Sequence, residues 1–194
     1  MKSVCVYCGS NTGATSAYPE AAAALGRAIA ARGMRLVYGG TTSGNMKVLA
    51  DATLAAGGKV LGIITASLRE RGKQHHGLSE IEVVDDLLQR KARMIERSDA
   101  FIALPGGIGT LDELFATWSA GQLGEHLKPC GLLDVNGYFA KLSDFLDHMV
   151  AERFLKDQHR AMLAIAPDAD TLLDRLAAYQ APSLDKWFAP SPAG

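Results

Sequence analysis

The chain has 194 residues, of which 48% are hydrophobic, and carries a formal net charge of −1 with a pI near 6.5. A chain of this length buries one good core, so we expect a single domain at residues 1–180. The near-neutral charge argues against nucleic acid or a membrane surface as a partner. Apolar runs stop short of the roughly 18 residues that a membrane helix needs. A signal-peptide pattern is also missing, so we expect a cytoplasmic protein.

Short apolar runs alternate with helix-like segments along the chain. Strands are expected at 3–7, 35–38, 60–64, 81–84, 100–104, 131–135 and 163–166. Helices are expected at 18–32, 45–56, 87–97, 111–123, 138–152 and 171–179. This alternation predicts βα units and therefore an α/β fold with an open parallel sheet. Residues 181–194 contain three prolines (Pro182, Pro190 and Pro192) and no clear period, which is typical of a loose tail.

Glycine follows several of the expected strands. The turns are Cys8-Gly9-Ser10, Gly39-Gly40 and Pro105-Gly106-Gly107-Ile108-Gly109-Thr110. In an open parallel sheet, ligands gather at the carboxyl ends of the strands, where these turns would meet. The third turn runs from an apolar strand into a helix, so its backbone N–H groups and the helix dipole favour a phosphate. It has neither the third glycine of a dinucleotide fingerprint nor a Walker lysine, which favours a mononucleotide or a sugar phosphate.

The stretch from Thr110 to Glu113 fits two interpretations. In one, it is a capping box, in which Thr110 accepts from the Glu113 amide and the Glu113 side chain returns to Thr110. In the other, Asp112 points away from the phosphate and Glu113 faces a ribose. A carboxylate placed there would stabilise the positive charge that develops on the sugar carbon when a sugar–base bond breaks.

Two cations interrupt the apolar face of the helix expected at 87–97. The stripe is formed by Leu87, Leu88, Met94 and Ile95, and it is broken by Arg90 and Lys91. Their long stems could cover apolar surface while the charges reach water. Alternatively, they meet a phosphate or a carboxylate. Arg93 and Arg97 lie on an outer row and need only solvent.

The three cysteines offer little for a metal. Cys5 and Cys8 have a CxxC spacing, but a zinc site would want a second pair of ligands, and His75-His76 is isolated. We interpret Cys5 as a small core residue of a strand and Cys8 as part of the following loop.

Taken together, these residues resemble the LONELY GUY family, cytokinin riboside 5′-monophosphate phosphoribohydrolases once labelled lysine decarboxylases. The resemblance rests on Arg90-Lys91, residues 99–104 and the PGGxGTxxE motif from Pro105 to Glu113. It continues through Gly121-Gln122-Leu123-Gly124, Lys128-Pro129 and residues 132–138, and upstream through residues 6–10 and 36–40.

The resemblance implies a three-layer, Rossmann-like αβα domain, usually a homodimer, with no metal or organic cofactor. Its reaction is hydrolysis of the N-glycosidic bond of adenosine 5′-monophosphates, including N6-modified ones, to a free base and ribose 5-phosphate, as in cytokinin activation. Arg90 and Glu113 match the catalytic pair. Substrate-binding positions are Lys91, Gly106, Gly107, Ile108, Gly109, Thr110 and Ser119, and the neighbouring turns add Gly9, Ser10, Gly39 and Gly40.

Several positions depart from the family pattern. The positions concerned are Thr41, Asn45, Lys47, Gly72, Leu87 and Leu88. Gly72 stands where a glutamate often contacts the base side of the substrate. The changes at Thr41, Lys47 and Gly72 favour an alternative, a nucleotide-binding or sensing module that has lost turnover. A pyridoxal-dependent lysine decarboxylase would need a Schiff-base lysine, and no lysine stands out in that role.

Overall fold

The computed structural model describes residues 1–182, so most of the expected tail, residues 183–194, lies outside the described part. Within it, seven strands form one sheet in the order β4-β3-β2-β1-β5-β6-β7. The strands are β1 Ser3–Tyr7, β2 Arg35–Tyr38, β3 Lys59–Thr65, β4 Glu80–Val84, β5 Ala100–Ala103, β6 Cys130–Leu133 and β7 Leu163–Ala166. All neighbouring strands pair in parallel, which confirms the predicted open parallel sheet.

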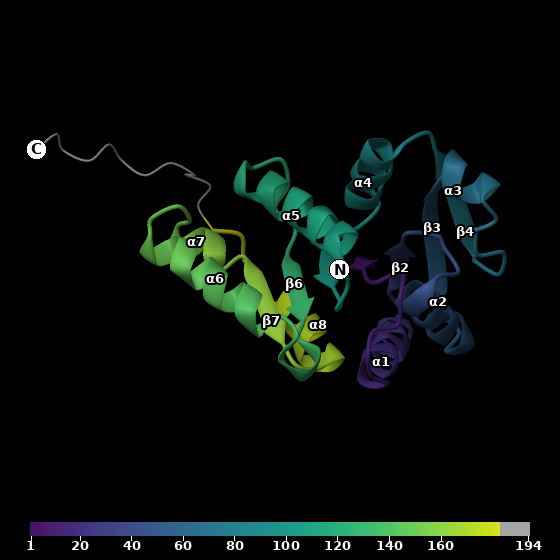
Figure 1. The fold of residues 1–194 in the computed structure, drawn as a ribbon, viewed down its shortest axis with the longest axis horizontal. Helices are drawn as coiled ribbons and strands as arrows, with labels where there is room; N and C mark the ends of the chain where they lie inside the picture. Colours follow the sequence, from purple (N-terminus) through teal and green to yellow (C-terminus); the bar gives the residue numbers. More distant parts are fainter. Residues whose placement is uncertain (183–194) are drawn as a thin grey trace, which may run out of the picture.

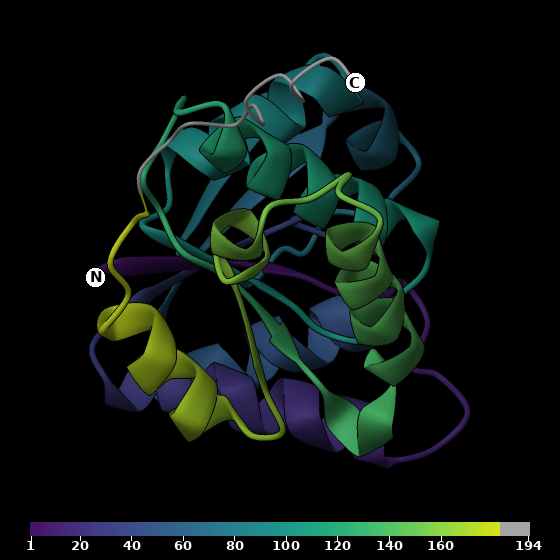
Figure 2. The same ribbon diagram turned by 90° about the vertical axis from the view of Figure 1, so that its left-hand side faces the viewer.

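Two layers of helices cover the sheet, one on each face (Figures 1 and 2). One layer contains α1 Ala17–Ala31, α2 Gly44–Ala55 and α8 Ala169–Ala177. The other contains α4 Leu87–Glu96, α5 Ile108–Gln122 and α6 Ala140–Ala151. The predicted three-layer arrangement is therefore confirmed. In the part of the chain that the structure describes, every helix is too short or too polar to cross a bilayer.

Alternation along the central strands explains why both faces are covered. In β1, Val4 and Val6 pack into the core on the α1, α2 and α8 side, whereas Cys5 and Tyr7 pack into the core on the α4, α5 and α6 side. Successive side chains of a strand point to opposite faces, so a strand buried on both sides is a continuous apolar run. This is why the sequence pattern located the strands.

Some element boundaries differ from the prediction. Helix α5 begins at Ile108 instead of Leu111, because Gly107 is its N-cap. Strand β6 ends at Leu133, and a short 3-10 turn, Val135–Gly137, precedes α6. Two short helices, α3 Ala66–Glu70 and α7 Asp157–Arg160, were not predicted. Helices of this length are below the span over which hydrophobic periodicity is visible.

The chain reverses its direction across the sheet between β1 and β5. Strands β1 to β4 proceed one way, and β5 to β7 are added on the other side of β1. The helices that follow β1 and β5 therefore lie on opposite faces of the sheet, which creates a crevice at the carboxyl edge, the usual ligand position in such folds. A hydrogen bond of 3.4 Å from the Gly9 N–H to the Pro105 carbonyl joins the two loops.

Candidate active site

A cleft of about 250 Å³ opens at this crevice, between α5, α4 and the start of α2. Its lining consists of Cys8, Ser10, Met46, Arg90, Gly107, Ile108, Gly109, Thr110 and Glu113. The predicted glycine turn, the buried cation and the buried acid thus share one cleft. Cys8 and Met46 were not predicted as lining residues, because Cys8 was interpreted as part of the loop after the first strand and the Met46 side chain carries no chemical signal. Burial raises the pKa of the Cys8 thiol, which therefore stays neutral.

The N-terminus of α5 forms one wall of this cleft. The N–H groups of Thr110 and Leu111 return to the Gly107 carbonyl at 3.1 and 3.3 Å. The N–H groups of Ile108 and Gly109 lie in the first turn of α5, where a helix offers no acceptor. Together with the helix dipole, such N–H groups favour an anion. A side chain at Gly106 could not fit, because its Cβ would lie 2.1 Å from the Thr110 hydroxyl. Glycine at position 106 therefore lets the turn pack against Thr110 at the start of α5.

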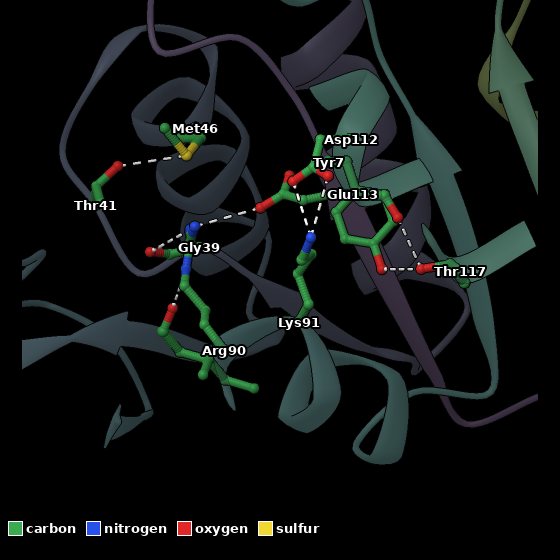
Figure 3. Close-up of polar contacts among 10 residues, drawn as sticks. Tyr7, Gly39, Thr41, Met46, Arg90, Lys91, Asp112, Glu113 and Thr117 are labelled. Atoms are coloured by element: carbon green, nitrogen blue, oxygen red, sulfur yellow. Dashed lines mark hydrogen bonds and ion pairs between the residues drawn. The ribbon is translucent and has the colours of Figure 1, made fainter. Parts of the chain in front are cut away.

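Arg90 is held by three acceptors from three different segments (Figure 3). Its Nε donates to the Ile63 carbonyl at 2.9 Å and its Nη2 to the Gly39 carbonyl at 3.0 Å. Its Nη1 lies 3.3 Å from Glu113 Oε1. The side chains of Arg90 and Glu113 are only 10% and 15% exposed. Snorkelling is thus the wrong interpretation of Arg90, since its charge points inward to a carboxylate.

Glu113 faces the cleft and does not cap its own helix. The N-cap of α5 is Gly107, and Thr110 lies inside the first turn, so the capping-box interpretation is wrong. Burial raises the pKa of the Glu113 carboxyl, and Asp112 adds to this, while Arg90 and Lys91 lower it. A carboxylate whose pKa is raised binds a proton more readily than an ordinary surface carboxylate, which suits a general base.

Lys91 neutralises the second acid of the motif. Its Nζ contacts both carboxylate oxygens of Asp112, at 3.1 and 3.0 Å (Figure 3). Asp112 therefore does not leave an unpaired negative charge beside the amides at the α5 N-terminus. Lys91 is not among the residues that line the cleft, and its predicted contact with the substrate stays a prediction.

We expect Lys91→Met to weaken substrate binding through Asp112. Loss of the ammonium group leaves an unpaired carboxylate near the N–H groups of the α5 N-terminus, so KM for a phosphorylated substrate, if these N–H groups bind it, should rise by up to about fivefold, the worth of an exposed ion pair. The additional change Asp112→Asn should restore KM. If steady-state kinetics show no such restoration, Lys91 contacts the phosphate itself.

The apolar stripe predicted for α4 is wrong in part. Leu87 and Leu88 are 60% and 74% exposed, whereas Met94 and Arg90 are the buried residues of this helix. Arg93 and Arg97 were expected to need only solvent, but both pair with Glu82 of β4. The inward face of α4 is therefore more polar than its sequence pattern predicts.

A second cavity of about 270 Å³ adjoins the cleft and shares Ser10 and Gly107 with it. Other residues that line it include Gly9, Asn45, Pro105, Gly106, Tyr18 and Tyr138. The Tyr138 hydroxyl donates to the Gly106 carbonyl at 2.6 Å and so stabilises the glycine turn after β5. Neither Tyr18 nor Tyr138 was predicted as a site residue, because their approach depends on long-range packing.

The remaining predicted site residues differ in whether they contact the cleft residues. Gly39 and Gly40 are buried in the loop after β2, and Gly39 contributes its carbonyl to Arg90. Ser119 is exposed on α5 and is not among the lining residues of the cleft, so its contact with the substrate stays a prediction. Within residues 1–182, no group of three or more His, Cys, Asp or Glu side chains is arranged to hold a metal ion.

The fold and this cleft define a class: a Rossmann-like α/β protein whose cleft is lined by a helix N-terminus and a buried guanidinium–carboxylate pair. Sequence comparison identifies the family within that class. A family described as "Possible lysine decarboxylase" matches residues 46–176. The chain belongs to this family, whose similar members are named cytokinin riboside 5′-monophosphate phosphoribohydrolases.

Three relatives illustrate the similarity. The probable cytokinin riboside 5′-monophosphate phosphoribohydrolase LOGL6 of Oryza sativa subsp. japonica is 43% identical over 96% of this chain and 74% of that protein. Cytokinin riboside 5′-monophosphate phosphoribohydrolase LOG5 of Arabidopsis thaliana is 43% identical over 93% of this chain and 79% of that protein. The phosphoribohydrolase LOG7 of Arabidopsis thaliana is 42% identical over 96% of this chain and 85% of that protein.

Solved structures share the fold at low sequence identity. A molybdenum cofactor binding protein from Rippkaea orientalis has a TM-score of 0.69 at 21% identity, covering 92% of this chain and 97% of that one. The molybdenum cofactor carrier protein of Chlamydomonas reinhardtii has a TM-score of 0.69 at 20% identity, covering 92% and 99%. At such identities the likeness concerns the fold alone.

Proposed function

We propose that this protein hydrolyses the N-glycosidic bond of adenosine 5′-monophosphates, with or without an N6 substituent, to a free base and ribose 5-phosphate. The single observation that carries the proposal is the position of Glu113. Its carboxylate pairs with Arg90 in the same cleft as the amides of the α5 N-terminus. The names of the relatives support this substrate class.

In the proposed mechanism, the N–H groups of Gly107, Ile108 and Gly109 hold the 5′-phosphate, and the Thr110 hydroxyl adds a contact. The ribose then lies over Glu113. As the bond between C1′ and the base breaks, its electron pair goes to the base nitrogen, and Glu113 stabilises the cationic sugar. Water adds to C1′ and gives a proton to the Glu113 carboxylate, which releases it to solvent, and the departing base nitrogen takes up one proton from solvent, so the free base leaves neutral. Arg90 keeps that carboxylate in place or assists the departing base.

A nucleotide-binding or sensing module is the second candidate. The observation that favours it is Thr41, which is buried and donates to Met46 Sδ at 3.4 Å (Figure 3). Because Met46 lines the cleft, a side chain at position 41 alters the environment of a cleft wall, which we propose to face the base. A changed base end would reduce turnover of N6-modified substrates while leaving phosphate binding intact.

A substrate panel tests the proposal directly. The purified protein is incubated with AMP, GMP, CMP and isopentenyl-AMP, and the free base and ribose 5-phosphate are quantified together. We expect equal amounts of the two products from AMP-type substrates. Tight binding by calorimetry without product from any substrate would establish the sensing module instead.

Two further proposals concern the assembly and the location of the protein. The resemblance to a dimeric family supports a homodimer, and the exposed Leu87, Leu88, Leu123 and Leu127 provide apolar surface for a partner. A cytoplasmic location is the expectation from the composition of the chain. Light scattering measures the first, and fractionation of cells that express the protein measures the second.

A further inference from the structure

His75 is a buried histidine that the proposed mechanism does not use. It lies in the loop between α3 and β4, and its side chain is only 10% exposed. Its Nδ1 accepts from the Gly77 N–H at 3.1 Å, so the ring proton is on Nε2 and donates to Asp51 Oδ1 of α2 at 2.8 Å. Both ring nitrogens are thus occupied, and the ring joins its own loop to a helix of the opposite layer.

The backbone around His75 joins the same loop to the glycine turn after β2. The His75 N–H donates to the Gly40 carbonyl at 3.0 Å, and the Thr42 N–H donates to the Lys73 carbonyl at 3.0 Å. Between them, Thr41 and Gln74 form an isolated antiparallel bridge. The turn is therefore paired with a segment that the His75 ring keeps in place.

This pairing reaches the catalytic pair through one peptide group. Gly39, next to Gly40, offers its carbonyl to Arg90 Nη2 at 3.0 Å, and Arg90 in turn contacts Glu113 (Figure 3). Asp51, the partner of the His75 ring, also pairs with Lys47 of α2. Burial opposes ionisation of Asp51, yet its bonds to Lys47 and His75 keep its pKa below the usual value. Asp51 therefore remains an acceptor at neutral pH.

We propose that His75 is a positioning residue: by joining Asp51 to the loop at 73–77, it holds the Gly39–Gly40 turn and thereby fixes Arg90 against Glu113. His75 does not line the cleft, so the effect passes through Arg90. The inference rests on the proposed function for its kinetic consequence. Its structural consequence is independent of turnover.

The test compares His75→Ala, His75→Gln and His75→Asn. Glutamine keeps a donor near the position of Nε2, and asparagine keeps an acceptor near the position of Nδ1. We expect His75→Ala to lower kcat by about 10- to 100-fold, since small misplacements of catalytic groups have effects of this size. KM should stay within about threefold, because the phosphate amides are untouched. The two partial mimics should be intermediate.

Two readouts separate positioning from a general loss of stability. Arg90 lowers the pKa of Glu113, so a displaced Arg90 should move the acid limb of the kcat profile to higher pH. Carbon-13 NMR of the Glu113 carboxyl should show the same upward shift even if the protein turns over no substrate. Leu172→Ala is the control, because this buried residue lies in α8 on the β6–β7 half of the sheet. It should lower the melting temperature without moving either readout.

The proposal is overturned if folded His75→Ala keeps the wild-type Glu113 titration. If His75→Ala does not fold, the glutamine and asparagine variants decide by the same titration. Absence of product from wild-type protein, with a shifted titration in the variants, would reject the proposed function and leave the positioning role standing.

Discussion

Glu113→Gln is expected to lower kcat by about 10³-fold with KM nearly unchanged. The amide has the shape of the carboxylate but cannot stabilise a sugar cation or take a proton from water. The effect should fall on kcat, because the anion-binding amides of the α5 N-terminus are not altered. Release of ribose 5-phosphate from AMP under saturating substrate measures it.

The same variant carries its own control for folding. Burial raises the pKa of Glu113 above its value in the unfolded chain. The folded protein therefore loses stability as the pH rises from the unfolded pKa to the folded pKa, because the buried carboxyl must then ionise. Glutamine is neutral and still accepts from Arg90, so the melting temperature at neutral pH should be unchanged or higher. A variant that folds and retains more than about a tenth of the wild-type kcat would exclude Glu113 as the catalytic acid–base group.

Arg90→Ala is expected to lower kcat by about 10²- to 10³-fold and to change the pH profile as well. Burial raises the pKa of Glu113 and Arg90 lowers it, so removal of the guanidinium raises this pKa further. The ionised fraction at pH 7 then falls, and activity should recover as the pH is raised. The measurement is kcat as a function of pH for both proteins.

Arg90→Lys is the matched variant. Lysine keeps the charge but lacks the planar guanidinium that donates to Ile63, Gly39 and Glu113 together. We therefore expect the acid limb of the kcat profile to shift in the same direction as in Arg90→Ala, but by less. The profile also separates the two roles of Arg90. An acid limb that stays in place while kcat falls would assign Arg90 to the departing base.

Sequence patterns predicted the sheet because the apolar pattern of each strand lies within a few consecutive residues. Strands such as β1 and β5 are buried on both faces, so each is a short apolar run that needs no knowledge of its neighbours. The glycine turn after β5 was equally visible, since strand, glycine and helix follow one another in the chain. These features are confirmed by the structure.

The errors and omissions concern features that no local side-chain pattern signals. The stretch from Thr110 to Glu113 has the pattern of a capping box, but the N-cap is Gly107, which has no side chain to signal it. Leu87 and Leu88 have helical spacing with Met94, yet they are exposed because α4 turns Arg90 and Met94 inward. The contact of His75 with Asp51 spans 24 positions and leaves no local pattern.

Arg90 takes two of its three fixed contacts from main-chain carbonyls, and this has a consequence for how the family can diversify. Carbonyls are present whatever side chain a position carries, so the residues around the guanidinium can be exchanged without disturbing it. Gly39 is the exception, because a Cβ there would lie 1.8 Å from Nη2. New substrate preferences can therefore evolve at neighbouring positions such as Thr41 while the reactive centre is inherited intact.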